Sequence, residues 1–172
     1  MPKIIENVRE QLLCEAKRQI EKNGYAKTTV RSVALSCGIG VGTVYNYFKS
    51  KDMLIASFMA EDWLSCLEKM KTSATEPKAV LKGVYDGLCA FIEKNKALFR
   101  DKAAAKSFMS AFEMRHRQLR RQLAEVVRPI CSASPAEDKD FVAEFVAQAL
   151  LSFSMEGKSF DELYSVLGLL LK

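Results

Sequence analysis

Apolar residues recur every three to four positions along most of the chain, which is the spacing of a helix with one buried face. The first such segment runs from about Lys3 to Asn23, and Asn23-Gly24 is expected to end it because both residues tolerate a left-handed backbone. Its buried stripe is Ile5, Val8, Leu12, Ala16 and Ile20. Strand-like alternation is scarce, and only four Pro and eight Gly interrupt the chain. The pattern therefore predicts an all-α protein of about nine helices.

Start and stop signals place the other helices. Two short helices are predicted at about 29–36 and 41–47, and a long helix is predicted from Lys51 to Met70 with Ser50 as its N-cap. Apolar periodicity then predicts helices around residues 81–92 and 104–131, with a less regular stretch from Asn95 between them.

The last quarter of the chain contains two sequences typical of helix starts. Ser134-Pro135-Ala136-Glu137 and Ser159-Phe160-Asp161-Glu162 both have a capping hydroxyl followed by an acid at the third position. They predict helices at about 135–156 and 160–171, with Gly157 closing the first of them.

The positive charge of the chain is concentrated at its N-terminal end. Residues 1–51 hold nine Lys or Arg and four Glu, and the totals of 26 and 21 leave 17 residues of each sign beyond position 51. The net charge of +5 therefore belongs to the first 51 residues. A basic excess confined to one small module favours a polyanionic partner, although the same charge also serves solubility.

The five cysteines are widely spaced and form no Cys-x-x-Cys pair. This usage is typical of reduced thiols and predicts neither a disulfide framework nor a metal site. No apolar run is long enough for a membrane span or a signal peptide, so we expect a cytoplasmic protein without a membrane partner. No motif for a cofactor is present, and none is expected.

The segment between residues 24 and 51 has the spacing of a helix-turn-helix. Ala34 is small where two short helices approach closely, Gly38 permits the tight turn, and Ile39 and Val44 supply the apolar wedge beneath it. The second short helix is left with an exposed face of small, hydroxyl and aromatic residues without an acid. This face, which can enter a major groove, comprises Val41, Gly42, Thr43, Tyr45 and Asn46.

The aromatic residues of this segment allow two interpretations. Tyr47 and Phe48 are as well suited to the core as to DNA, whereas Tyr45 has polar neighbours and favours the surface. Gly40 and Gly42 leave few long hydrogen-bonding side chains, so we expect thymine-methyl contacts or DNA shape to carry much of the specificity.

Residues of about 4–55 resemble the TetR/AcrR family of transcriptional repressors. The resemblance rests on Thr29-Val30 through Ala34, on Gly38-Ile39-Gly40-Val41-Gly42-Thr43-Val44-Tyr45-Asn46-Tyr47-Phe48, and on Lys51 and Leu54. It implies that Thr29, Thr43, Tyr47 and Lys51 contact phosphates, and that Arg31, Val41, Gly42, Thr43, Tyr45 and Asn46 face the groove. It also implies a helix-turn-helix DNA-binding domain at 1–51 and a helical effector-binding and dimerisation domain at 52–172.

The middle helices carry soft and aromatic side chains that suit an adaptable apolar pocket, although a stripe of this kind is more often core. The candidate ligand-binding residues are Trp63, Cys66, Met70, Tyr85, Cys89, Phe108, Met109 and Phe112. The last two helices are apolar over more than one face, and this excess predicts a homodimer interface. The candidate interface residues are Phe141, Phe145, Ala149, Phe153, Leu163, Val166, Leu167 and Leu170.

The inventory argues against an enzyme, because the chain has one His and lacks the usual hydrolase, phosphate-loop and dinucleotide motifs. The favoured interpretation is a dimeric repressor that a small apolar or aromatic effector releases from double-stranded operator DNA. The alternative is a DNA-binding adaptor whose C-terminal domain binds a protein partner and no small molecule.

Overall fold

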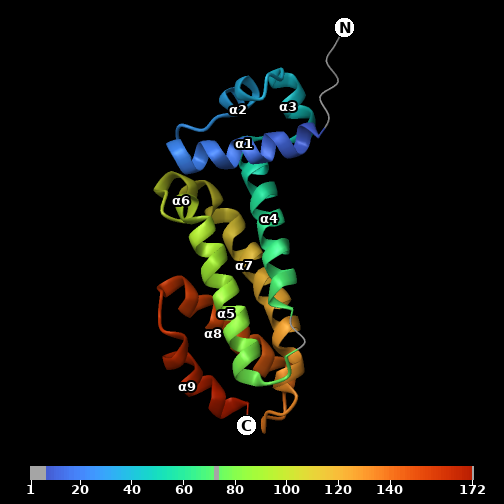
Figure 1. Ribbon diagram of the computed structural model, residues 1–172, viewed down its shortest axis with the longest axis vertical. Helices are drawn as coiled ribbons and strands as arrows, with labels where there is room; N and C mark the ends of the chain where they lie inside the picture. The colour runs from blue at the N-terminus through green and yellow to red at the C-terminus, as the bar shows by residue number, and fades with distance from the viewer. Residues whose placement is uncertain (1–6, 72–73, 172) are drawn as a thin grey trace. The chain divides into compact units, whose positions relative to one another are not determined.

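The computed structural model describes residues 7–71 and 74–171, and the backbone alone for 108–115. Its helices, labelled in Figure 1, are α1 (Val8–Asn23), α2 (Val30–Ser36), α3 (Val41–Tyr47), α4 (Lys51–Met70), α5 (Pro77–Lys94), α6 (Lys96–Phe99), α7 (Lys102–Cys131), α8 (Lys139–Glu156) and α9 (Phe160–Leu170). None of the described residues forms a strand, so the predicted all-α fold is confirmed.

Most predicted helix ends agree with the structure, and two starts do not. Gly24 and Gly157 end α1 and α8 with φ of 80° and 68°, as expected of residues that tolerate the left-handed region. The predicted start of α1 at Lys3 is wrong, because Asn7 has φ of 57° and the helix begins at Val8. The predicted start of α8 at 135 is wrong as well, because the side chain of Asp138 accepts a hydrogen bond from the Phe141 backbone and caps the helix.

Local hydrogen bonds explain why α8 begins after Asp138 and not at the predicted position 135. Ser134 is buried, its backbone N–H donates to Cys131 O, and its side chain accepts from the Ala136 backbone at 3.3 Å. The Ser-Pro sequence therefore forms a turn, and Asp138 takes the capping position. At α9 the predicted start at Phe160 is confirmed, but the Ser159 side chain makes no capping hydrogen bond.

By its internal contacts the chain divides into two units. Unit 1 comprises residues 1–62 and 95–110, and unit 2 comprises residues 63–94 and 111–172. This packing boundary differs from the functional boundary predicted after residue 51, which stays a prediction. Because α4 and α7 each contribute to both units, neither unit is a continuous segment of the chain.

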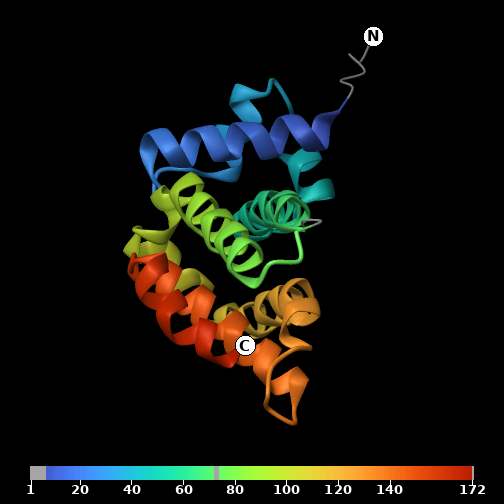
Figure 2. The same cartoon turned by 60° about the horizontal axis from the view of Figure 1, so that its bottom comes forward.

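Unit 1 is organised around α1, α2 and α3, which stay together in both views (Figure 1, Figure 2). Helix α1 packs on α2, and α2 packs on α3. The core beneath these helices is apolar and includes Leu12, Ala16, Val33 and Val44 together with Ile55 of α4, each fully or almost fully buried. Burial of this kind stabilises a small domain by about 25 cal/mol for each Å² of apolar surface removed from water.

Unit 2 is built on α5, which contacts both α8 and α9, while α8 and α9 also contact each other. Its core includes Leu81, Leu88, Leu123, Leu150 and Leu167, each at most 1% exposed. No helix in the described part of the chain has the length and apolar character needed to cross a membrane.

Candidate nucleic-acid interface

The first helix of the helix-turn-helix, α2, begins with a reciprocal cap that spacing alone did not reveal. The Ser32 backbone donates to Thr29 Oγ1 at 3.0 Å, and the Thr29 backbone donates to Ser32 Oγ at 3.0 Å. Both bonds satisfy N–H groups that a helix start otherwise leaves without a partner. The Thr29 hydroxyl accepts one bond in this cap, so its own O–H is available to an external acceptor.

The turn between α2 and α3 has the geometry that the sequence predicted. Gly38 has φ of 65°, a conformation that L side chains rarely adopt, and the Ile39 backbone donates to Ala34 O at 2.9 Å. Ala34 and Val44 are 1% and 0% exposed, and Ile39 packs against the same core. This apolar wedge fixes the angle between the two short helices.

The outer face of α3 carries the side chains predicted to enter a groove. Gly42, Thr43 and Asn46 are exposed, and Val41 is half-buried. The rings of Tyr45 and Tyr47 are 46% and 48% exposed, so both lie on the surface, whereas Phe48 is buried in the core. A Cβ added at Gly42 would meet no atom within 4 Å, so the backbone at the start of α3 is open to solvent.

The charged side chains of the segment that carries this face are all positive. From Lys22 to Lys51 the chain contains five cations, which are Lys22, Lys27, Arg31, Lys49 and Lys51, and no Asp or Glu. Arg31 is exposed on α2, where its guanidinium can approach a base edge or a phosphate. A surface with hydroxyls, aromatic rings and cations but no carboxylates is suited to DNA.

Lys51, which is predicted to contact a phosphate, also contacts Tyr25 within the chain. Its Nζ donates to Tyr25 O at 3.0 Å and lies 3.6 Å from the centre of the Tyr25 ring. Burial lowers the pKa of the Lys51 ammonium. Lys51 therefore joins the α1–α2 loop to the start of α4 and keeps two further N–H groups for an external acceptor.

Tyr25 is the centre of a polar network that the sequence reasoning missed. Its hydroxyl donates to Asp52 Oδ1 at 2.5 Å, and its backbone donates to Asp101 Oδ2 at 3.0 Å. Ser107 Oγ donates to the second oxygen of Asp52 at 2.7 Å. Burial, followed by the hydrogen bond to Asp52, raises the pKa of Tyr25.

This network fastens the helix-turn-helix to α6 and the start of α7 within unit 1. Asp101 also caps α7, because the Ala103 and Ala104 backbones donate to its Oδ1, and backbone hydrogen bonds lower its pKa. Asp52 and Asp101 are 27 and 76 residues from Tyr25, so no local spacing could have connected them. The only available signal was a tyrosine directly after the glycine that ends α1.

Of the residues predicted to bind an effector, Phe108 and Met109 fall within unit 1 and the others within unit 2, where Trp63 and Met70 are buried. Trp63 is 5% exposed, meets Phe91 edge to face at 5.4 Å between ring centres, and donates from Nε1 to Gln122 at 2.8 Å. Met70 is 1% exposed and lies so close to Gly87 that an added Cβ would be 2.8 Å from its terminal carbon.

The other candidate effector residues include two thiols and a tyrosine. Cys66 and Cys89 are half-buried, Cys66 Sγ donates to Gly87 O at 3.1 Å, and burial raises the pKa of Cys89. The Tyr85 hydroxyl lies between Phe153 O and Lys158 O at the end of α8. Phe108, Met109 and Phe112 lie outside the residues whose side chains are described.

The predicted interface residues fall into two groups. Phe141, Phe145, Phe153 and Val166 are 66%, 47%, 38% and 57% exposed, so they form an apolar face on α8 and α9. Ala149 and Leu170 are half-buried. Leu163 and Leu167 are 6% and 1% exposed within the single chain, so these two side chains belong to the core of unit 2.

Across the described residues, no three His, Cys, Asp or Glu side chains gather in a way that could hold a metal ion. No such group therefore lies on the described residues of α2 and α3. What these helices present is a binding surface of hydroxyls, rings and cations.

Comparison with known proteins supports a DNA-binding role for this surface. Residues 12–58 match the profile described as "Bacterial regulatory proteins, tetR family", and the matched span contains all of α2, the turn and α3. The HTH-type transcriptional repressor KstR2 of Mycolicibacterium smegmatis is 29% identical over 150 residues, which cover 80% of this chain and 73% of that protein.

Two further matches differ in how much of the chain they cover. The fatty acid metabolism regulator protein of Bacillus subtilis is 33% identical over 72 residues, which cover 42% of this chain and 37% of that protein. The crystal structure of a transcriptional regulator from Cytophaga hutchinsonii has a TM-score of 0.66 and 20% identity, and the match covers 92% of this chain and 89% of that one. The first is similar over part of its length, and the second shows the fold alone.

Proposed function

Since this chain belongs to the tetR family of bacterial transcriptional regulators, we propose that it acts as a homodimeric repressor that a small apolar molecule releases from its operator. It is a DNA-binding regulator and not an enzyme. The observation that carries the proposal is the face of α3, exposed, free of acids and fixed from below by the buried Ala34 and Val44. Because its proposed target is operator DNA, we expect it to act in the cytoplasm.

In this proposal the exposed side chains divide the work on DNA. Thr29, Thr43, Tyr47 and Lys51 contact phosphates and set the register, whereas Arg31 and Tyr45 reach base edges. The small residues Val41 and Gly42 let the α3 backbone approach the groove, and Asn46 supplies an amide that can pair with adenine. Few long side chains are involved, so DNA shape contributes to the choice of site.

A second copy of the chain is the proposed partner of the α8–α9 face. Phe141, Phe145, Phe153 and Val166 expose apolar surface that a monomer rarely leaves uncovered. A two-fold axis through this face would join two DNA-binding heads and match two half-sites about one helical turn apart, or a multiple of that spacing.

The proposed effector binds among the middle helices of unit 2, near Trp63, Met70 and Tyr85. Their soft and aromatic surface suits an apolar molecule. The Bacillus subtilis relative is named for fatty acid metabolism, so long-chain acyl compounds are the first probes to use. A ligand that prefers the released state by about 1 to 3 kcal/mol would lower operator affinity roughly 5- to 150-fold.

The competing proposal keeps DNA binding and replaces the effector with a protein partner. Calorimetry with and without operator DNA separates the two, because linkage requires DNA and effector to weaken each other by the same factor. If no acyl or aromatic compound shows this coupling, the adaptor proposal replaces the effector proposal.

Variants of the head test the DNA-binding proposal. Arg31→Ala should weaken binding and relax base preference at one operator position by about 1 to 3 kcal/mol. Lys51→Ala should weaken all sequences alike and flatten the dependence on salt. The measurement is fluorescence anisotropy on a panel of single-base operator variants, and the same loss of base preference from both substitutions would contradict the assignment.

A further inference from the structure

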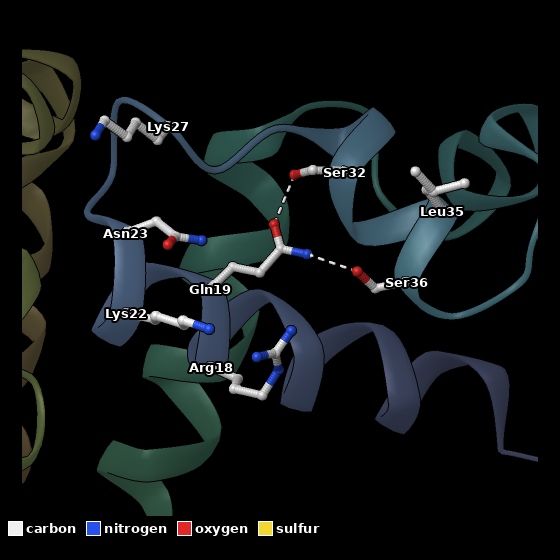
Figure 3. A pocket seen from close by; sticks show the side chains of 8 residues that line it. All are labelled: Arg18, Gln19, Lys22, Asn23, Lys27, Ser32, Leu35 and Ser36. Carbon is white, nitrogen blue, oxygen red and sulfur yellow. Dashed lines mark hydrogen bonds between the residues drawn. The ribbon is translucent and has the colours of Figure 1, made fainter.

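A pocket of about 280 Å³ lies between α1, the loop that follows it and α2 (Figure 3). Arg18 and Lys22 reach it from α1, Lys27 from the loop, and Ser32 and Ser36 from α2. None of these five residues has a function predicted from the sequence. The pocket thus combines serine hydroxyls with cations, which are groups that bind phosphate oxygens.

The floor of the pocket is a buried glutamine that holds both hydroxyls in place. Gln19 is 4% exposed, and its Nε2 donates to Glu15 Oε1 at 2.7 Å and to Ser36 Oγ at 3.2 Å. Ser32 Oγ donates to Gln19 Oε1 at 2.6 Å. Figure 3 shows the two bonds that join Gln19 to the serines. The pocket is therefore ordered before any ligand arrives.

The charges around the pocket do not cancel. Arg18 forms two hydrogen bonds of 2.7 Å with Glu15, which hold the pKa of that carboxyl at about 2, so this pair is neutral as a whole. Among the described residues, no carboxylate lies within ion-pair distance of Lys22 or Lys27. Two lysines that line the pocket thus lack a neutralising partner among the described residues, and in Figure 3 the Lys27 Nζ points away from Gln19.

The pocket lies beside the proposed DNA-binding face, so DNA is the nearest source of a phosphate that could bind there. Leu35 lines the pocket and lies four residues after Arg31, so the two side chains share one face of α2. Lys27 precedes the cap residue Thr29 by two positions. The pocket therefore adjoins residues proposed to contact the groove and the backbone.

We propose that this pocket binds a backbone phosphate of the operator, outside the base pairs that α3 reads, with Lys22 and Lys27 as the charged contacts. This inference rests on the proposed DNA-binding function. The contact adds affinity and fixes the orientation of the head without reading sequence, because phosphates are the same at every step.

The test compares the wild type with Lys22→Gln/Lys27→Gln and with the control Lys69→Gln/Lys158→Gln. The control removes the same total charge from exposed positions in unit 2. Anisotropy is measured between about 50 and 200 mM salt on a duplex of about 30 base pairs that carries an operator recovered by selection, and on a scrambled duplex. Thermal unfolding of each variant checks that the head stays folded.

Loss of two phosphate contacts should reduce the slope of log affinity against log salt by about 1.8. The ratio of wild-type to variant affinity should then be roughly 12-fold larger at the lower salt than at the higher, with unchanged base preference and an unchanged slope for the control. A pocket variant with the wild-type slope, or a control with the same change, overturns the inference.

The outcome also distinguishes failure of the inference from failure of the proposed function. If the wild type does not prefer operator to scrambled DNA, the proposed function fails, whatever the slopes. If pyrophosphate at constant ionic strength protects the wild type but not the pocket variant from thermal unfolding, while both have the same DNA slope, the pocket takes a soluble phosphorylated ligand and the DNA inference is overturned.

Discussion

Replacing Gln19 with methionine is expected to lower the free energy of unfolding of unit 1 while keeping the length and volume of the side chain. The residue is 4% exposed and joins α1 to α2 through hydrogen bonds to Glu15, Ser32 and Ser36. The thioether of Gln19→Met fills the same space and can make none of these bonds at comparable strength.

The magnitude follows from what each partner loses. The bond to the Glu15 carboxylate is charge-assisted and contributes about 1.5 to 3 kcal/mol. Ser36 is exposed and can bond to water instead, and Ser32 keeps a second acceptor in Thr29 O at 2.9 Å. The expected net loss is therefore about 2 kcal/mol, which corresponds to a fall in the melting temperature of roughly 4 to 8 °C when all 172 residues unfold in one transition.

Urea and thermal unfolding followed by circular dichroism measure this loss. Gln118→Met is the matched control, because Gln118 is exposed on α7 and its replacement should change stability by less than about 0.5 kcal/mol. If Gln19→Met is as mild as the control, the hydrogen bonds between α1 and α2 contribute little, and the account of a pocket ordered by Gln19 is refuted.

Three further results are expected. Gly42→Ala should stabilise the fold by about 0.5 to 1 kcal/mol in unfolding experiments, since its new methyl group meets no atom within 4 Å, yet weaken operator binding roughly tenfold in gel shifts because α3 must approach DNA closely. Phe145→Glu should give folded monomers in sedimentation, whereas Leu167→Glu should unfold the chain itself, because Phe145 is 47% and Leu167 is 1% exposed. Folded dimers of Phe145→Glu would show that Phe145 does not lie in the dimer interface. Hydrogen bonds hold the folded-state pKa of Glu15 at about 2, below the usual 4.5. The stability that the wild type has over Glu15→Gln should therefore be complete above pH 4.5 and should vanish as the pH falls toward 2, and exposure of the Arg18 partner limits this difference to about 1 kcal/mol. A pH-independent difference in thermal midpoint would contradict the assignment.

The fold could be predicted because helix signals are local. Apolar periodicity and Gly24, Gly38 and Gly157 placed most helix ends, since each signal acts within one or two turns. The start of α8 failed because two local signals competed, and burial of Ser134 made a turn of the first while Asp138 capped the helix.

The exposure of most residues on the outer face of α3 was predictable for the same reason, whereas the contacts that hold the helix-turn-helix to the rest of unit 1 were not. Tyr25 meets Asp52 and Asp101 only after the chain has folded, and Gln19 is a polar residue whose burial no periodicity indicates. On α9 the sequence pattern could not separate Leu167, which packs inside the chain, from Val166, which is exposed, because both are apolar residues on one short helix.

Selection of genomic fragments by the purified protein, followed by footprinting, is the most direct test of sequence-specific binding to an operator. We expect enrichment of a two-fold or nearly two-fold site, protected on both half-sites and bound about 10³-fold or more tightly than random DNA at moderate salt. Recovery of fragments without a shared site, bound no better than random DNA, would contradict it.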